Sequence, residues 1–353
     1  FGMRQAIYDK DNREWRINGK RMFLRGTNYI ATQWLSEMNR ERFNYDVGLM
    51  KGANVNVVRV HAHVTAKEFY QACDEAGLLI WQDFPLQWGY ADNDQFHESA
   101  LRQAREMIAV LYNHPSIIAW SLHNEPPWDA DWMKYKYRHY NPKQNKKLTE
   151  NLYSETAPLD NTRYLHAYSS TAEHPWLGWY SGSWLDYIKP TKLDIVAEFG
   201  AQALPNIEGL RQILNEDELW PENDKAWKKW EYHNFQRRET FNNAKVSMGS
   251  NPAEFIHNTQ QYQAKLIKLA AESYRRQRYN PVNSIYQFMF VEDWPSMNWG
   301  IVDYWRNPKP GYHALKLAYQ PVLPSIAWEK EHFKVGEGAA FTLWVINDLL
   351  QSF

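Results

Sequence analysis

The chain has 353 residues, and its 40 Lys and Arg nearly balance 41 Asp and Glu, so a formal charge of −1 supplies no basic field for nucleic acid. The single Cys73 excludes an internal disulfide, a cysteine-rich zinc site and a Cys-x-x-Cys redox pair. No apolar run reaches the roughly 18 residues that a membrane-spanning helix needs, so neither nucleic acid nor a membrane is an expected partner.

Short aliphatic strands alternate with helical patterns in the first third of the chain. We expect strands at residues 22–28, 55–60, 78–84 and 116–121. Asn39 is placed to cap a helix before the second strand, and Thr65 and Glu68 have the spacing of a capping box. Gly77 is placed to end the helix that follows them. This alternation is typical of βα units around a parallel sheet.

Four further strands are expected at residues 164–169, 176–181, 194–199 and 284–291. Eight parallel strands with intervening helices predict an α/β fold, a (β/α)8 TIM barrel with its active site at the carboxyl ends of the strands. A doubly wound sheet is disfavoured, because no Gly-x-Gly-x-x-Gly or Gly-Lys-Ser/Thr sequence follows a strand. The aromatic-rich residues 200–283 are expected to form a lid or wall over the barrel mouth.

The helical rhythm ends after Pro324. Residues 333–335 and 341–346 flank the turn sequence Gly336-Glu337-Gly338 and are expected to form strands. We therefore divide the chain into a barrel over residues 1–323 and a short C-terminal β segment over residues 324–353. The second unit is expected to begin a following β-sandwich-like domain.

Two carboxylates lie at predicted strand ends. Glu125 follows strand 116–121, and Glu198 comes at the end of strand 194–199, before Gly200. Cleavage of a glycosidic bond needs such a pair, one carboxyl ionised and one protonated. The 18 Trp and 22 Tyr also suit stacking against sugar rings. Each glutamate alone could simply pair with an arginine, but two at the mouth of one barrel favour a glycosidase.

Several motifs place these glutamates in a family. Asn124-Glu125 and Glu198 resemble the acid/base and the nucleophile of clan A glycosidases. The start of the barrel resembles glycoside hydrolase family 2 in the segments Phe1-Gly2-Met3-Arg4, Ile17-Asn18-Gly19-Lys20 and Phe23-Leu24-Arg25-Gly26-Thr27-Asn28. The motifs most similar to β-mannosidases are Trp81-Gln82-Asp83-Phe84, Glu198-Phe199-Gly200-Ala201-Gln202-Ala203-Leu204-Pro205 and Asp293-Trp294-Pro295-Ser296.

The resemblance implies a retaining exo-β-glycosidase that hydrolyses a β-linked oligosaccharide or glycoside without cofactor or metal. Glu198 would attack the anomeric carbon, while protonated Glu125 would donate to the leaving oxygen. Arg59 matches an arginine beside the nucleophile, and Asn124 matches the residue that bonds the sugar's 2-hydroxyl. Trp294 matches a sugar-stacking aromatic residue.

The pocket wall and the surroundings of the barrel follow from the same resemblance. Tyr180 and one of the two histidines His61 and His63 are expected to line the sugar pocket. The family also implies accessory β-sandwich domains in a longer chain. One cysteine and the absence of an Asn-x-Ser/Thr sequence fit a bacterial cytoplasmic or periplasmic protein, and leave the compartment open between the two.

Three alternatives stay open at the level of the sequence. His123-Asn124-Glu125-Pro126 and Gly178-Trp179-Tyr180 are closer to β-galactosidases and β-glucuronidases, and His61-Ala62-His63 stands where β-mannosidases usually have Trp-Gly-Gly. His61 and His63, two apart on a strand, could share a metal in a metal-dependent barrel hydrolase. A non-catalytic sugar-binding barrel is disfavoured, because a binder needs no pair of mutually repelling carboxylates.

Overall fold

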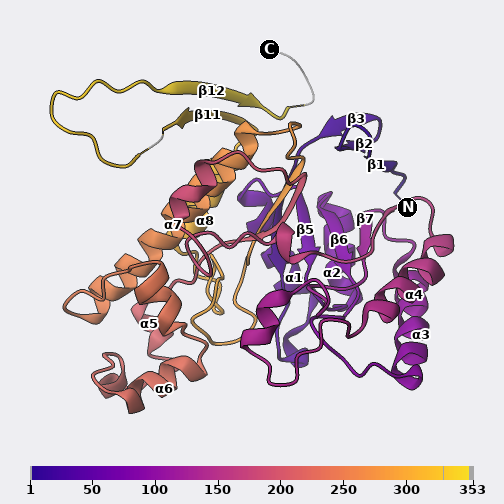
Figure 1. Cartoon of the computed structure of the whole chain (residues 1–353), viewed down its shortest axis with the longest axis horizontal. Helices are drawn as coiled ribbons and strands as arrows, with labels where there is room; N and C mark the ends of the chain where they lie inside the picture. The colour runs from indigo at the N-terminus through magenta and orange to yellow at the C-terminus, as the bar shows by residue number, and fades with distance from the viewer. Residues whose placement is uncertain (1, 329, 350–353) are drawn as a thin grey trace.

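The computed structural model describes residues 2–328 and 330–349, and its centre is a seven-stranded sheet (Figure 1). The strand order is β8-β7-β6-β5-β4-β10-β9, and every neighbouring pair is parallel. The strands are β4 (Leu24–Tyr29), β5 (Val57–Val60), β6 (Leu79–Asp83), β7 (Ile117–Ser121), β8 (Tyr164–His166), β9 (Ile195–Phe199) and β10 (Ser284–Gln287). Seven of the eight expected barrel strands are thus present.

The expected sixth strand is absent from the described sheet, which stays open between β8 and β9. Residues 176–181 fold into a turn instead, and the backbone N–H groups of Trp179 and Tyr180 both donate to the carbonyl of Trp176. Trp176 has φ 42° and Gly178 has φ 80°, so the backbone enters the left-handed region twice within three residues. The prediction of a strand here was wrong, because an aromatic run that resembles a strand is bent back on itself.

Helices cover the outside of the sheet (Figure 1). Asn39 caps α1 (Arg40–Gly52) by accepting a bond of 3.0 Å from the N–H of Arg42, and Gly77, with φ 63°, ends α2 (Lys67–Ala76) as expected. The capping box at Thr65 was wrong, because Ala66 occupies the N-cap position and no side chain caps this helix. The helices are α1 (Arg40–Gly52), α2 (Lys67–Ala76), α3 (Asp94–Leu111), α4 (Lys146–Thr156), α5 (Ile207–Leu210), α6 (Asp224–Tyr232), α7 (Pro252–Arg276) and α8 (Pro310–Ala318).

Short helical turns lie mainly in the loops. They are the 3-10 turns η1 (Leu35–Glu37), η2 (Asp131–Tyr135), η3 (Ala157–Leu159), η4 (Thr171–Glu173), η5 (Trp184–Ile188) and η6 (Glu216–Glu218), and the π-helical turn η7 (Glu239–Asn243). None of the described helices is both long enough and apolar enough to cross a membrane.

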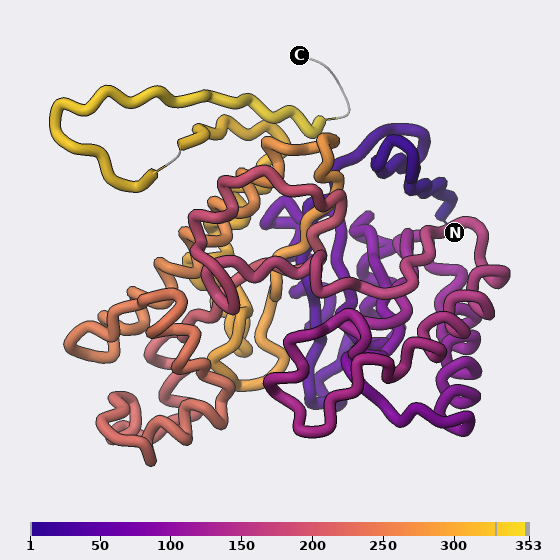
Figure 2. The backbone as a smooth tube through the Cα atoms, in the orientation of Figure 1, coloured from indigo at the N-terminus to yellow at the C-terminus, as the bar shows by residue number. Residues whose placement is uncertain are grey.

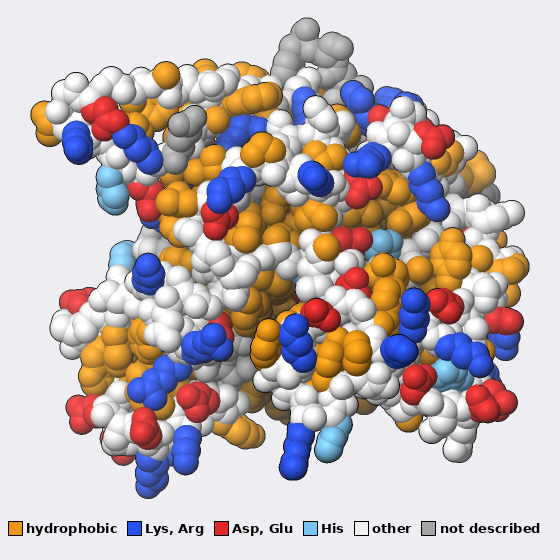
Figure 3. Space-filling view, in the orientation of Figure 1, with side chains coloured by type: hydrophobic (Ala, Val, Ile, Leu, Met, Phe, Trp, Pro, Cys, Tyr) orange, Lys and Arg blue, Asp and Glu red, His pale blue; other side chains and the backbone are white. Residues whose placement is uncertain are grey.

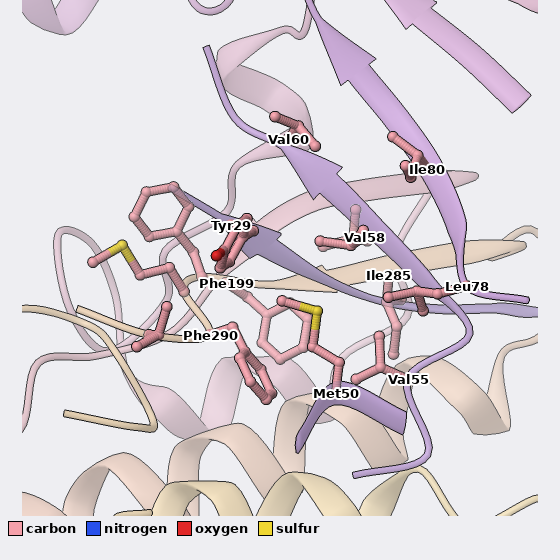
Figure 4. Packing of buried hydrophobic residues seen from close by; sticks show 14 of the residues in the cluster. Tyr29, Met50, Val55, Val58, Val60, Leu78, Ile80, Phe199, Ile285 and Phe290 are labelled. Carbon is pink, nitrogen blue, oxygen red and sulfur yellow. The ribbon is translucent and has the colours of Figure 1, made fainter. Parts of the chain in front are cut away.

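Two apolar clusters hold the barrel together. The outer cluster packs the sheet against the helices, and Figure 4 shows Met50 beside Val55 and Val58 of the strand region it covers. The inner cluster fills the space enclosed by the sheet, where Trp81 of β6 meets Tyr286 of β10 with ring centroids 5.4 Å apart. Because three ladders separate those two strands in the sheet, this contact crosses the barrel interior.

A small antiparallel sheet that the sequence did not predict lies at the amino ends of the barrel strands. It consists of β1 (Ala6–Asp9), β2 (Glu14–Ile17) and β3 (Lys20–Met22). Trp15 on β2 is fully buried in the inner cluster, edge-on to Tyr164 of β8 with centroids 5.6 Å apart. The aromatic ring thus closes the interior at the end away from the predicted active site.

Residues 200–251 form a wall beside the mouth, projecting at the lower left of Figure 2. A separate hydrophobic cluster holds this segment together, in which Trp230 and Phe235 pack on Phe255 of α7 and Trp227 stacks on Phe235. The Gln202 side chain donates to the carbonyl of Asn234 at 2.9 Å, which ties the segment to the loop after β9.

The chain ends in an antiparallel hairpin of β11 (Val322–Ala327) and β12 (Thr342–Asn347), which projects at the top of Figure 1. The expected strand at 341–346 is confirmed, whereas residues 333–335 form no strand and β11 takes the role of the partner. Hydrophobic side chains lie along the outer surface of the hairpin, Trp344 among those exposed (Figure 3). The division of the chain at residue 323 stays a prediction.

Candidate active site

Glu198 lies on β9, where all five residues of the strand are buried. Its Oε1 lies 3.2 Å from Nη1 of Arg59, and its Oε2 accepts a bond of 3.2 Å from the indole N–H of Trp176. The side chain is only 6% exposed, so these two donors face the carboxylate in a site with little water. Each oxygen of the carboxylate thus has a nitrogen donor at 3.2 Å.

Arg59 on β5 is fully buried and contacts three polar side chains. Its Nε lies 3.0 Å from Oδ2 of Asp83 and its Nη2 donates to Oδ1 of Asn124 at 2.7 Å, while Nη1 serves Glu198. Burial alone would raise the pKa of Asp83, but the charge of Arg59 lowers it to about 2. The cation is thus held between two carboxylates at the strand ends.

Glu125 follows β7 on a strained segment, with φ 45° at a residue that carries a side chain. The carboxylate accepts a bond of 3.0 Å from the indole N–H of Trp88 on Oε2 and faces Nδ1 of His174 at 3.0 Å on Oε1. The backbone N–H of Glu125 donates to the carbonyl of Ser169, beyond β8. The left-handed backbone turns this side chain back into the mouth.

His174 joins the two glutamates. Its Nδ1 lies 3.0 Å from Oε1 of Glu125, and its Nε2 lies 3.7 Å from Oε1 of Glu198. The ring is fully buried, and its Nε2 is also 2.9 Å from Oγ of Ser169. The two carboxylates therefore face opposite nitrogens of one imidazole.

The protonation of this group follows from its charges. Burial opposes a charge on the ring, but the carboxylates of Glu198 and Glu125 raise the pKa of His174 above its ordinary value. Burial would likewise raise the pKa of Glu125, but the hydrogen bond from His174 lowers it. The imidazole of His174 and the carboxylate of Glu125 thus each favour the charged form of the other.

The structure brings some of the other predicted pocket residues to this cluster. His61 lies 3.6 Å from Asp83, edge-on to Phe288 with centroids 5.1 Å apart. His63 instead contacts the carbonyl of His61 through Nδ1 at 3.0 Å, and burial lowers its pKa to about 4. Of the pair, His61 is the one next to the charged cluster.

Tyr180 and Trp294 lie further out. Tyr180 packs against Trp176 with centroids 5.4 Å apart, and its hydroxyl accepts a bond of 2.8 Å from Gln236 of the wall. Trp294 stacks on His233 of the wall, with centroids 5.5 Å apart and planes 20° apart. Tyr180 thus contacts Trp176, which itself bonds Glu198, whereas Trp294 lies against the wall.

The family model described as "Glycosyl hydrolases family 2, TIM barrel domain" matches residues 10–323 of this chain. The chain belongs to glycosyl hydrolase family 2. The resemblance expected from the motifs, to this family and to its β-mannosidase-like members, is confirmed. The TIM barrel of the family is here the seven-stranded sheet, open at one seam.

Relatives within family 2 include "Beta-mannosidase B" of Emericella nidulans, 26% identical over 99% of this chain and 47% of that protein. A "Putative beta-glucuronidase" of Formosa agariphila is 34% identical over 51% of this chain and 23% of that protein. The crystal structure of a β-D-mannosidase from Dictyoglomus thermophilum has a TM-score of 0.82 and 25% identity, over 99% of this chain and 44% of that one. This chain thus spans less than half the length of these proteins.

The family 2 barrel also contains site residues that sequence reasoning missed. Asp83 ends β6, and its place at a strand end was a usable signal. Trp176 lies in the segment taken for the sixth strand, His174 lies two residues before that segment, and Phe288 follows β10. Within the described ranges, no group of three or more His, Cys, Asp or Glu side chains is arranged to hold a metal ion.

Proposed function

We propose that this chain carries the catalytic centre of a retaining exo-β-glycosidase of the β-mannosidase type, acting on β-linked oligosaccharides or glycosides. One observation carries the proposal: Glu125 and Glu198 face opposite nitrogens of His174, and only Glu198 has the guanidinium of Arg59 beside it. The two carboxylates thus have different electrostatic surroundings, as an acid and a nucleophile require.

The residues have distinct roles in this reaction. Glu198, kept ionised by Arg59, attacks the anomeric carbon while a proton passes from Glu125 to the leaving oxygen. The bond between the sugar and Glu198 is then hydrolysed by a water that Glu125 deprotonates, and the sugar leaves with its configuration retained. Asn124, held by Arg59 through its Oδ1, directs its amide group toward the 2-hydroxyl of the sugar.

Retention rather than inversion is part of this proposal. An inverting pair of carboxyl groups stands about 6.5–9.5 Å apart to admit a water, whereas a retaining pair stands about 5–5.5 Å apart. The assignment of Glu198 as a direct nucleophile is supported by the guanidinium of Arg59, whose Nη1 lies 3.2 Å from the Glu198 carboxylate.

The surroundings of Arg59 favour a neutral sugar over a uronic acid. The Arg59 guanidinium contacts Asp83 through Nε, Glu198 through Nη1 and Asn124 through Nη2. Each of its nitrogens therefore already has a partner other than the carboxylate of a uronic acid. The β-mannosidase names of the relatives with the longest matches agree with a neutral sugar. A β-glucuronidase-like or β-galactosidase-like specificity is the second candidate, favoured by the relative from Formosa agariphila.

Release of nitrophenol from aryl β-mannoside, β-galactoside, β-glucuronide and β-glucosaminide tests the proposal. We expect wild-type release to be fastest from the mannoside, to vanish in Glu198→Ala and to ignore EDTA. Release that does not depend on Glu198 would overturn the assignment of Glu198 as nucleophile. Faster release from the glucuronide than from the mannoside would overturn the assigned sugar preference. EDTA-sensitive release would contradict a mechanism carried by carboxylates alone.

The accessory β-sandwich domains of a longer chain remain a prediction.

A further inference from the structure

His174 occupies a place that the two-carboxylate mechanism does not use. Its ring is fully buried between the two glutamates, two residues before the turn that replaces the sixth strand. Nδ1 faces Glu125 at 3.0 Å, and Nε2 faces Ser169 at 2.9 Å. A ring with a partner on each nitrogen has a fixed orientation, so its proton positions can be derived from those partners.

The hydrogen bonds behind His174 determine which nitrogen donates. The hydroxyl of Ser169 donates its one hydrogen to Oε2 of Glu173 at 3.2 Å. Burial would raise the pKa of Glu173, but His166, whose Nε2 is 3.1 Å from the same oxygen, lowers it, so Glu173 is an ionised acceptor. The oxygen of Ser169 must then accept, and Nε2 of His174 is the donor.

The other side of the ring therefore holds a second proton. With Nε2 protonated, a neutral imidazole has a bare Nδ1, which cannot bond an ionised Glu125. The contact of 3.0 Å requires one proton between Nδ1 and Oε1, either on the imidazole or on the carboxyl. Both placements have the same total charge, so the proton can move across this contact without exchange with solvent.

We propose that His174 is a positioning residue that stores, jointly with Glu125, the proton delivered to the leaving group. This inference rests on the proposed glycosidase function and deepens it. At rest the proton lies on Nδ1 and Glu125 is a carboxylate. During bond cleavage it moves to Glu125 and from there to the leaving oxygen, which leaves His174 neutral and Glu125 ionised, ready to deprotonate water.

The groups around the ring support this storage. Glu125 faces it from the loop after β7 and Glu198 from β9, and both carboxylates favour a charged imidazole. Arg59 on β5 opposes that charge, but its guanidinium is paired with Asp83 and Glu198. Glu173, next to His174 in the chain, adds a further negative charge nearby. The carboxylates thus keep the proton in the site at a pH where an isolated glutamate would be ionised.

The test is the pH dependence of kcat/KM for His174→Gln, with a phenyl and a 2,4-dinitrophenyl glycoside of the sugar that wild type prefers. In His174→Gln, we expect the basic limb of the pH profile, where kcat/KM falls as the pH rises, to lie at least about one pH unit lower than in wild type for the phenyl glycoside. Activity on this substrate should fall about 100-fold at pH 7 and largely recover near pH 5. The dinitrophenyl glycoside needs little acid assistance, so its first step should change by less than about 5-fold.

His97→Gln is the matched control, because His97 is also buried and pairs with a carboxylate, Asp92, at 2.8 Å, but lies on α3. Its basic limb should coincide with that of wild type. Equal losses for His174→Gln at every pH and with both leaving groups, or an unmoved basic limb, would overturn the proposal. Thermal unfolding of each variant establishes that it is folded.

Ser169→Ala provides a second variant if His174→Gln does not fold. It removes the acceptor that fixes the proton on Nε2, so we expect a smaller shift of the basic limb in the same direction. An unmoved limb would overturn the inference for this variant as well. Failure of the proposed function is distinguishable, because it appears in wild type as release that does not depend on Glu198.

Discussion

The two ends of the barrel carry buried ion clusters of opposite composition. At the mouth, the single cation Arg59 is shared by the carboxylates of Asp83 and Glu198. At the opposite end, the single carboxylate of Asp348, just after β12, is shared by three guanidinium groups. These belong to Arg25, Arg275 and Arg278, at 3.1, 2.7 and 2.5 Å.

The contrast separates a reactive cluster from a structural one. In the proposed reaction, an excess of carboxylates around one cation would hold negative charge where a sugar carbon becomes positive, and histidine and indole groups contact the oxygens of the two glutamates. An excess of arginines around one carboxylate ties the C-terminal hairpin to β4 and α7 and offers no group for chemistry. Substitutions at the two ends should therefore change activity and stability separately.

The largest expected effect is at the mouth. Glu198→Ala should lower kcat/KM by at least about 10⁴-fold, because no other carboxylate stands where the nucleophile is needed. Its unfolding midpoint in urea should stay close to that of wild type, since the change also removes a buried charge. Release of nitrophenol and urea unfolding of the same preparation measure both. A loss below about 10-fold would contradict the role of Glu198.

The matching substitution at the other end should act on stability. Asp348→Asn leaves three arginines around a neutral side chain and should cost about 3–5 kcal/mol of unfolding free energy, with kcat unchanged. Asp224→Asn is the control, because Asp224 pairs with Arg237 at 3.2 Å but is 89% exposed. It should change stability by less than about 0.5 kcal/mol. Equal effects of the two substitutions in urea unfolding would refute the role of Asp348 in joining the C-terminal hairpin to β4 and α7.

Glu125→Ala should distinguish leaving groups. Hydrolysis of a phenyl glycoside should slow about 10²–10³-fold, because the leaving oxygen receives no proton. The first step with a dinitrophenyl glycoside should be nearly unchanged, which a pre-steady-state burst of nitrophenolate would show. Equal slowing of both substrates in this step would argue against Glu125 as the acid.

A smaller effect concerns acid stability at the mouth. The pKa of Asp83 is lowered from 3.8 to about 2 when the chain folds, so its contribution to stability is present above about pH 4 and is lost as the pH falls toward 2. The shift corresponds to roughly 2 kcal/mol. Asp83→Asn should be less stable at neutral pH and lose less between pH 4 and 2. Parallel stability curves for the two proteins in urea unfolding would contradict this account.

Strand ends explain why the sequence located so much of the site. Glu125 and Glu198 were predictable because a buried strand that ends in a carboxylate is visible in the sequence, and the ends of parallel strands converge. Asn124 and Arg59 follow the same logic, and the structure places them in contact. The same signal is present at Asp83, the last residue of β6, but was not used.

Periodicity failed where the backbone leaves regular geometry. Trp176 belongs to a turn whose left-handed residues have no signature in an aromatic run, and His174 lies two residues before that turn. The hairpin partner β11 was missed because both strands of this segment were expected after Pro324, around the turn at residues 336–338, although a proline is tolerated in the edge strand of a hairpin. Sequence thus located the two glutamates that we propose as acid and nucleophile, but not the imidazole of His174 between them.

The open seam between β8 and β9 has a consequence for how this site can vary. A residue on a barrel strand must keep its register with two neighbours, whereas residues 167–194 cross the seam without a ladder on either side. Insertions or deletions there can redirect His174 and Trp176 without disturbing the seven strands. Exchange of this one segment between relatives is therefore a route by which a common barrel could acquire a different substrate preference.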